Sequence, residues 1–381
     1  MKKTLFFLLV FIALFSCKNR STIIHADLEN MENSITLDLS DILKNISITQ
    51  ISTEFLLSVN SKVYVTSQYL IVNNEQSLHL FDRSGRHIRK LSERGNGPGE
   101  FFYIQDFFTD NQEEILYYID MMDRSHISRL DIGNGKALDP LPIDISFLET
   151  KHINGKIYGL PNYSGYFDNV SAEVDSAIIA CSISLPTGEI EKYRGWHKYS
   201  FIIMGSTIAS YHNEIDFINL GYSDTLFTLQ DNRLQSLCVL DFAEKMTDYR
   251  VGGNGIQLIS ANRKGIVLSK IRLKYTEQGE RLILNYIPKY YTLYDRKGSV
   301  SHIDAIRVMD TEIPIGDEGE LREASAWVSS PLPISCGKYG YMLIDPTHLN
   351  DPAAFLKKAG VQAIDFDPNN DNPFIIIGEI R

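Results

Sequence analysis

The sequence lacks most of the signatures on which a function could be assigned. Basic residues are the minority, with 37 Lys and Arg against 48 Asp and Glu, so the formal net charge is −11. This balance argues against a nucleic-acid partner, which requires a basic face. There is no G-x-S-x-G elbow, no H-x-H or H-E-x-x-H metal motif and no P-loop spacing. The sequence therefore assigns no catalytic residue, no metal ligand and no cofactor.

Cysteine is scarce, with four residues in 381 and no C-x-x-C pair that could form a zinc or redox motif. Apart from Cys17, the cysteines are Cys181, Cys238 and Cys336, each in or beside an apolar run. Three thiols in an exported protein cannot all pair. We expect them to be buried free thiols, because free cysteine packs as a small hydrophobic residue.

The one long apolar run is also too short to span a bilayer. It covers residues 5–15, behind the basic residues Lys2 and Lys3, and so has the form of a signal peptide. The following Leu14-Phe15-Ser16-Cys17 resembles a bacterial lipobox. The resemblance implies removal of residues 1–16 and acylation of Cys17; the alternative is an ordinary secretory signal with an incidental cysteine. Polar residues 17–34 are then expected to be a lipid-anchored tether, and residues 35–381 a single domain.

Glycine is concentrated in one short stretch, Arg94-Gly95-Asn96-Gly97-Pro98-Gly99-Glu100-Phe101. Glycine permits positive φ, and proline fixes φ and removes a donor, so neither a helix nor a ladder strand can run through this segment. We interpret Gly95, Gly97, Pro98 and Gly99 as structural turn residues. The stretch predicts a tight crossover between two small antiparallel sheets.

Alternating apolar segments recur along the whole chain, each group ending in a polar hairpin turn. The turns begin near residues 82, 131, 186, 230 and 295, and Gly85 and Gly298 end Asp-x-x-Gly turns of this series. Their spacing of roughly 45 to 65 residues is typical of propeller blades. A last blade can combine strands at 340–344 and 374–377 with the N-terminal strand at 46–51. The pattern predicts an all-β fold, a six-bladed β-propeller with four antiparallel strands per blade, whose ring the two termini close.

The lipobox, the hairpins, the glycine crossover and the terminal Asp371-Asn372-Pro373-Phe374 strand together resemble the six-bladed, NHL-like β-propeller lipoproteins of the Bacteroidetes. The resemblance implies a lipid-anchored location in the cell envelope, in the outer membrane, and no established reaction. The basic Lys18-Asn19-Arg20 after the lipobox departs from the acidic stretch associated with surface export. Both the periplasmic and the surface side therefore remain open.

Two groups of residues are candidates for binding a ligand. Arg94 and Glu100 flank the glycine crossover, although a salt bridge or turn-stabilising hydrogen bonds would also explain them. The second group lies in one turn-to-strand stretch and is rich in aromatic side chains, which also pack in cores. Its members are Arg194, Trp196, His197 and Tyr199.

We therefore expect a monomeric binding module for a small molecule, a glycan or an envelope protein, held by a lipid anchor in the membrane. A metal-assisted hydrolase or lyase with its site in the central funnel is the alternative, because propellers can bring distant carboxylates or histidines together there. A structural subunit of an envelope assembly is a third hypothesis.

Overall fold

The computed structural model shows an all-β chain with two short helices, α2 (Leu39–Ile42) and α3 (Pro352–Lys358). The part that the structure describes is residues 24–28, 33–52, 54–57, 61–74, 76–120, 122–123, 125–145, 147–153, 155–161, 173–185, 187–198, 208–211, 214–219, 224–230, 233–241, 253–262, 265–278, 281–294, 299–315, 322–323, 334–346, 349–358 and 372–381.

The described strands form six open sheets, and each sheet contains a run of three or four strands that follow one another in the chain. The first two sheets are β4 (Lys62–Val65), β5 (Tyr69–Asn73), β6 (Ser77–Asp82) and β7 (His87–Glu93), then β8 (Ile104–Thr109), β9 (Ile115–Asp120), β10 (His126–Asp131) and β11 (Ala137–Pro142). The third is β12 (Phe147–Ile153), β13 (Lys156–Pro161), β14 (Glu173–Ser184) and β15 (Ile190–Lys198).

The remaining three sheets also contain strands from the N-terminal part of the chain. One is β16 (Ile208–Tyr211), β17 (Glu214–Asn219), β18 (Thr225–Gln230) and β19 (Arg233–Asp241), joined by β1 (Ile24–Asp27). The next is β20 (Gly253–Asn262), β21 (Gly265–Gln278), β22 (Arg281–Tyr294) and β23 (Ser299–Val308), joined by β2 (Ser34–Asp38), β24 (Thr311–Pro314) and β25 (Arg322–Glu323). The last is β26 (Ile334–Cys336), β27 (Tyr339–Ile344), β28 (Phe374–Ile380) and β3 (Leu43–Thr49).

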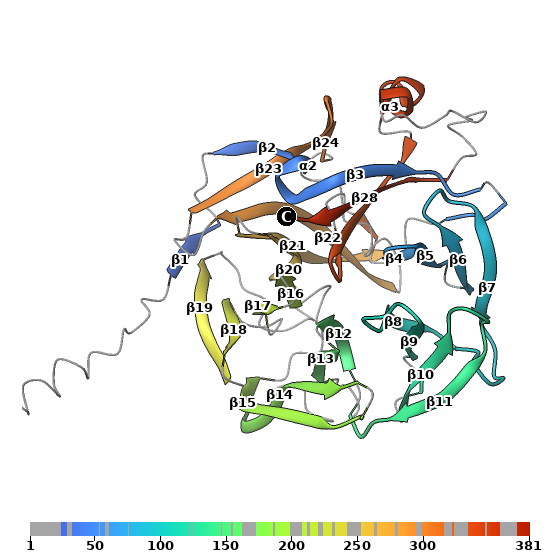
Figure 1. The fold of residues 1–381 in the computed structure, drawn as a ribbon. Helices are drawn as coiled ribbons and strands as arrows, with labels where there is room; N and C mark the ends of the chain where they lie inside the picture. Colours follow the sequence, from blue (N-terminus) through green and yellow to red (C-terminus); the bar gives the residue numbers. More distant parts are fainter. Residues whose placement is uncertain are drawn as a thin grey trace, which may run out of the picture.

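The sheets succeed one another around a common centre, with β4, β8, β12 and β16 nearest to it and β7, β11, β15 and β19 at the rim (Figure 1). Hydrogen bonds join the first three sheets at the beginnings of their inner strands. Lys62 Nζ donates to Gln105 O over 2.6 Å, and Gln105 Nε2 donates to Phe147 O over 2.8 Å. Because these residues start β4, β8 and β12, the three inner strands run in the same direction.

The antiparallel order places alternate connections at opposite ends of each sheet. One end of each sheet holds the connections from the first to the second strand and from the third to the fourth. Where these strands are consecutive in the chain, the connections contain five residues or fewer, and we call this end the tight-turn face. The other connections begin and end at the opposite end of each sheet, which we call the loop-rich face; they comprise, among others, residues 94–103, 162–172, 199–207, 242–252 and 345–373.

The N-terminal residues cross the outer edges of three successive sheets. Strand β1 pairs in parallel with β19, β2 pairs in parallel with β23, and β3 pairs antiparallel with β28. The last pairing confirms that the two ends of the chain share a sheet, since Ile376 lies opposite Ile48. Strand β1 falls within the segment that the sequence analysis assigned to the tether. Its alternation of exposed and buried residues, with Ala26 and Leu28 inward, lets it complete a sheet edge.

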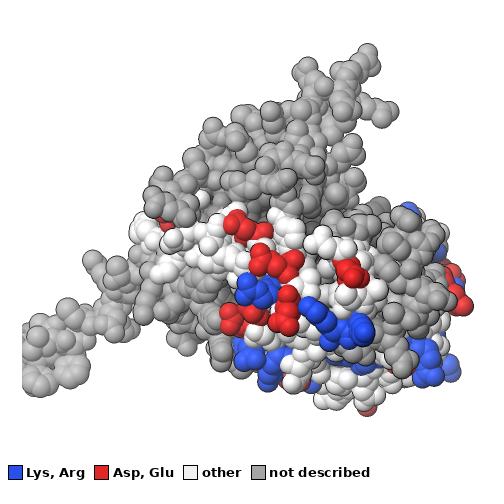
Figure 2. Space-filling model, turned by 90° about the horizontal axis from the view of Figure 1, so that it is seen from above, with Lys and Arg blue, Asp and Glu red and all other residues white. Residues whose placement is uncertain are grey.

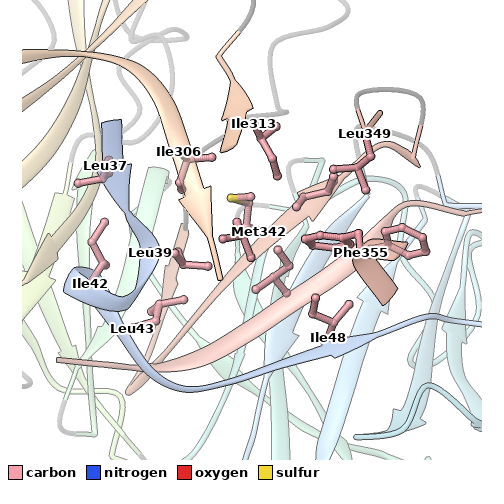
Figure 3. Close-up of a cluster of buried hydrophobic side chains, with 14 of the residues drawn as sticks. Leu37, Leu39, Ile42, Leu43, Ile48, Ile306, Ile313, Met342, Leu349 and Phe355 are labelled. Atoms are coloured by element: carbon pink, nitrogen blue, oxygen red, sulfur yellow. The ribbon is translucent and has the colours of Figure 1, made fainter. Parts of the chain in front are cut away.

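A hydrophobic cluster fixes this N-terminal segment to the rest of the fold. It gathers side chains from β2, α2, β3, β23, β27 and α3 (Figure 3). Leu39 and Leu43 are fully buried, and Leu356 of α3 joins them at the same depth. Burying one such side chain contributes about 2 kcal/mol. Asp351 caps α3 by accepting from Ala354 N over 2.9 Å, as the Asp-Pro start of the helix predicts.

Candidate functional site

The glycine crossover forms the turn that the sequence predicts, and Glu100 is part of its construction. Gly97 N donates to Glu100 Oε2 over 2.7 Å, while Gly95 N donates to Phe101 O over 2.9 Å. A Cβ on Gly95 would lie 2.0 Å from Glu100 Oε2, so the absence of a side chain makes room for the carboxylate. Gly99 adopts φ +78°, which favours glycine. Glu100 therefore turns inward and stabilises the loop.

Arg94, at the other end of the crossover, points to solvent instead. Its guanidinium lies over the ring of Phe102, 5.8 Å from the centroid, in a cation–π contact. Within the described part of the chain, no carboxylate lies within ion-pair distance of Arg94, because Glu100 is committed to the Gly97 amide. Arg94 is therefore an exposed cation held against an aromatic ring.

A single carboxylate organises the residues that follow the crossover. Asp120, at the end of β9 and only 9% exposed, accepts from Phe102 N over 2.5 Å and from Tyr103 N over 3.2 Å. It also accepts from Met122 N over 3.0 Å, and so ties the β9–β10 connection to the crossover. The side chains of these three residues remain exposed, at 45%, 48% and 68% for Phe102, Tyr103 and Met122. We call Arg94, Phe102, Tyr103 and Met122 the Arg94 patch; it lies on the loop-rich face.

A second polar group lies at the inner strands. Asp106 of β8 accepts from Thr150 Oγ1 of β12 over 2.5 Å. The pairing of β8 with β9 shifts register between Ile104 and Asp106, and irregularities of the bulge type are over-represented next to active sites. Burial raises the pKa of the Asp106 carboxyl, and the charge of Lys62, the Thr150 hydrogen bond and the charge of Lys151 oppose that rise.

A buried tyrosine, Tyr341, a half-buried one, Tyr64, and a buried thiol lie in the same region. Burial raises the pKa of the Tyr64 and Tyr341 hydroxyls, and Cys336 and Asp106 add to the shift through their charge. Burial also raises the pKa of Cys336 to about 11, so this thiol stays protonated near neutral pH and is a poor nucleophile. Asp106 is thus the carboxyl group of this cluster, and Lys62 and Lys151 are the cations that act on it.

The structure does not bring the two predicted groups of binding residues together. Arg194, Trp196 and His197 lie in β15, the outer strand of the third sheet, where Arg194 pairs with Ile178 and His197 with Val174. Figure 1 places β15 away from β7, at whose end the crossover starts. Three further residues singled out from the sequence, Cys17, Tyr199 and Gly298, lie outside the described residues.

Sequence reasoning missed Asp106 and Asp120, the two carboxylates on which these sites depend. Asp106 lies within an apolar run and Asp120 directly follows another, and both runs correctly indicated strands. A polar residue within or directly after such a run was the available signal. Their roles depend on a bulge and on contacts to distant segments, which the local pattern does not encode.

The surface and the cysteines agree with the expectations of composition. Seen from the top of Figure 1, acidic and basic side chains intermingle on the described surface (Figure 2). Exposed ion pairs of the chain include Lys44–Glu379 and Arg307–Glu312. Cys181, Cys238 and Cys336 are free and buried, as predicted. Among the residues that the structure describes, no three His, Cys, Asp or Glu side chains group as metal ligands would. No helix within that same part has the length and apolar character needed to cross a bilayer.

The fold and the two sites define an all-β protein of successive small sheets with one loop-bearing face. Its sequence belongs to the family described as Domain of unknown function (DUF4934), which matches residues 21–316. No functionally curated protein matches the chain.

One of the solved structures that resemble this chain shares its overall fold, and two others score lower. A Bacteroides fragilis protein described as exported has a TM-score of 0.56 at 12% identity, over 94% of this chain and 100% of that one. BamB from Moraxella catarrhalis has a TM-score of 0.40 at 12% identity, over 77% and 84% of the two chains. The Pan2 WD40 domain of Neurospora crassa has a TM-score of 0.30 at 10% identity, over 63% and 72%. At such identities the likeness concerns the fold alone.

Proposed function

We propose that the protein is an exported binding module, a six-bladed β-propeller that holds its ligand or partner on the loop-rich face. The six sheets are its blades, and strand β3 closes the ring by completing the blade of β26, β27 and β28. The observation that carries the proposal is the asymmetry between the two faces. Long connections begin and end on one face, while the other holds turns of five residues or fewer. Loops on a rigid scaffold are where binding residues concentrate.

We further propose that acylated Cys17 anchors the module in the envelope, on either side of the outer membrane, and that the anchor determines location and is not needed for folding. The lipobox supports this, and export is supported by the fold shared with the B. fragilis protein. The segment between Cys17 and strand β1 is short. Six or seven residues span at most about 25 Å even when extended, so the module would lie close to the lipid surface.

Site-specific photo-crosslinking in cells tests the binding face. A photoreactive residue replaces Gln76 or Asp144, on the loop-rich face, or Asn111 or Asn134, on the tight-turn face. Adducts with another envelope component are expected from the first pair alone. Adducts from the second pair alone would refute the proposal. Metabolic labelling with a fatty acid, lost in Cys17→Ala, tests the anchor.

One observation favours an enzyme as a second candidate. Asp106, with its raised pKa beside two lysines and Thr150, has the form of a general acid at the inner strands. The corresponding function is hydrolysis or a lyase reaction of a ligand that enters between the blades. A catalytic role requires that Asp106→Asn lower turnover of a glycoside or ester panel by at least about 100-fold. No turnover by the unaltered protein would leave the binding function as the only one.

A further inference from the structure

We propose that the Arg94 patch is a docking site for a protein segment that presents an apolar or aromatic side chain next to a carboxylate. The inference rests on the proposed function, since it assigns a partner class to one part of the loop-rich face. Exposed Phe102, Tyr103 and Met122 form its apolar part, and Arg94 supplies its charge. Aromatic residues, Met and Arg are the residue types enriched at protein interfaces.

The patch is held in place before any partner arrives. The Asp120 carboxylate receives the backbone amides of Phe102, Tyr103 and Met122, which lie in two different connections. Glu100 fixes the preceding turn through the Gly97 amide. The backbone beneath the exposed side chains is therefore ordered, so binding does not have to pay for ordering it.

The same hydrogen bonds decide what kind of ligand fits. A sugar is recognised through many hydrogen bonds to its hydroxyl groups, yet the amides of all three exposed apolar residues are already used by Asp120. What remains is mainly ring and thioether surface, which suits the apolar side chains of a protein. The patch is thus an apolar anchor site with one charge beside it.

The charge selects for a carboxylate. Arg94 is exposed and has no carboxylate within ion-pair distance in the described part of the chain. A planar guanidinium that stacks on Phe102 still offers its edge to a carboxylate, which it can bind through two hydrogen bonds. A second copy of the chain docked patch to patch would instead place Arg94 against Arg94. Complementarity therefore favours an acidic, apolar segment of a different protein.

The test uses the full mature chain and an immobilised library of synthetic peptides in which aromatic, aliphatic, acidic and basic residues vary independently. We expect the bound peptides to combine an apolar residue with Asp or Glu, and replacing that acid by Lys to weaken binding at least about tenfold. Tyr103→Ala should weaken the same peptides at least about tenfold, as loss of an interface anchor does. Arg94→Glu should abolish the preference for acidic peptides and favour basic ones.

The control is Ile88→Ala, which removes an exposed apolar side chain of β7 outside the patch and should leave peptide binding unchanged. Thermal unfolding shows that each variant is folded. The inference would be overturned if the selected peptides carried no acidic residue. It would also be overturned if they bound the Arg94→Glu and Tyr103→Ala variants as tightly as they bind the original chain. If those peptides still block crosslinking from Gln76 or Asp144, the proposed binding face stands without this patch. The inference would also be overturned if no peptide bound and the chain instead self-associated to an extent that Arg94→Glu changes. The patch would then be an interface with a second copy of the chain.

Discussion

Gly85 satisfies two constraints with one missing side chain. It ends the hairpin turn between β6 and β7 with φ +87°, and a Cβ there would lie 2.1 Å from Gln50 O at the end of β3. Asp82 completes the turn by accepting from Ser84 N over 3.0 Å. Thr49 Oγ1 donates to Arg83 O over 2.8 Å across the same boundary. The turn therefore stabilises the contact between the β4–β7 sheet and strand β3.

We predict that Gly85→Ala lowers the free energy of unfolding by about 3 kcal/mol, because a left-handed φ costs an L-residue about 1–2 kcal/mol and the backbone near Gln50 must also move. Gly135→Ala is the matched control: Gly135 ends the corresponding β10–β11 turn with φ +74°, but a Cβ there meets no atom within 4 Å. Gly135→Ala should lower the free energy of unfolding only by the cost of the left-handed φ. Urea unfolding of both variants measures their free energies of unfolding. Equal losses of stability would contradict the prediction, because the close approach of Gln50 O would then add no cost to Gly85→Ala.

Strands β1, β2 and β3 act together as a belt over three sheet edges. Ala26 of β1 and Leu28, directly after β1, face the core, and Leu28 N donates to Asp241 O over 2.8 Å. Cys238 lies in the same buried hydrophobic cluster as Ala26 and Leu28, so the belt helps to bury that thiol. Burial raises the pKa of Cys238 to about 11, which keeps the covered thiol protonated. The reactivity of Cys238 therefore reports on whether β1 is in place.

We predict that Leu28→Asp, in a Cys17→Ser background, speeds thiol labelling of Cys238 at least about tenfold. Losing the buried Leu28 side chain weakens local closure by about 2 kcal/mol, and each 1.4 kcal/mol corresponds to a factor of about ten. Peptide mass mapping identifies the labelled residue, and Cys181 and Cys336 serve as internal references. His25→Asn, an exposed change in the same strand, should have no effect. Uniform acceleration at all three cysteines would indicate global unfolding and contradict a separable belt.

The sequence allowed these elements to be predicted unequally. The hairpin at Asp82 and the pairing of the last strand, β28, with β3 were predictable, because turn chemistry and strict alternation are local. Strand β1 was assigned to a tether because its His-Ala-Asp-Leu alternation is short and only weakly apolar; its stability comes from the edge of β19, far along the chain. The placement of Asp120 and Asp106 depends in the same way on segments that meet only in the folded protein.

Among the described residues, two largely buried histidines, His79 and His152, favour their neutral forms and make the whole fold sensitive to acid. Burial lowers the pKa of His79 to about 4, and the charges of His87 and Lys90 add to the effect. Burial also lowers the pKa of His152 to about 4, against a small opposing effect of Asp110. His152 stacks on Phe108, with centroids 5.1 Å apart, and its Nε2 is buried without a hydrogen-bond partner. Protonation of either ring therefore opposes folding.

Because both folded-state pKa values lie below the unfolded value of about 6.5, the unfolded chain binds these protons first as the pH falls. The contribution of the two histidines is complete above pH 6.5, declines below it and is lost near pH 4. We predict a loss of about 1–2 kcal/mol per histidine between pH 7 and pH 5, less than the full pKa difference implies, since solvent screens these partly exposed rings. Urea unfolding at half-unit pH steps measures the slope.

His152→Phe separates the two contributions, because phenylalanine keeps the stacking on Phe108 and removes both the titrating group and the unpartnered Nε2. The variant should be more stable than the original chain by about 1 kcal/mol at pH 7, where only the unpaired nitrogen is removed. Its advantage should grow by a further 1–2 kcal/mol or so at pH 5, where the original chain must exclude a proton. A variant whose unfolding free energy runs parallel to that of the original chain from pH 7 to pH 5 would place the acid sensitivity elsewhere in the protein.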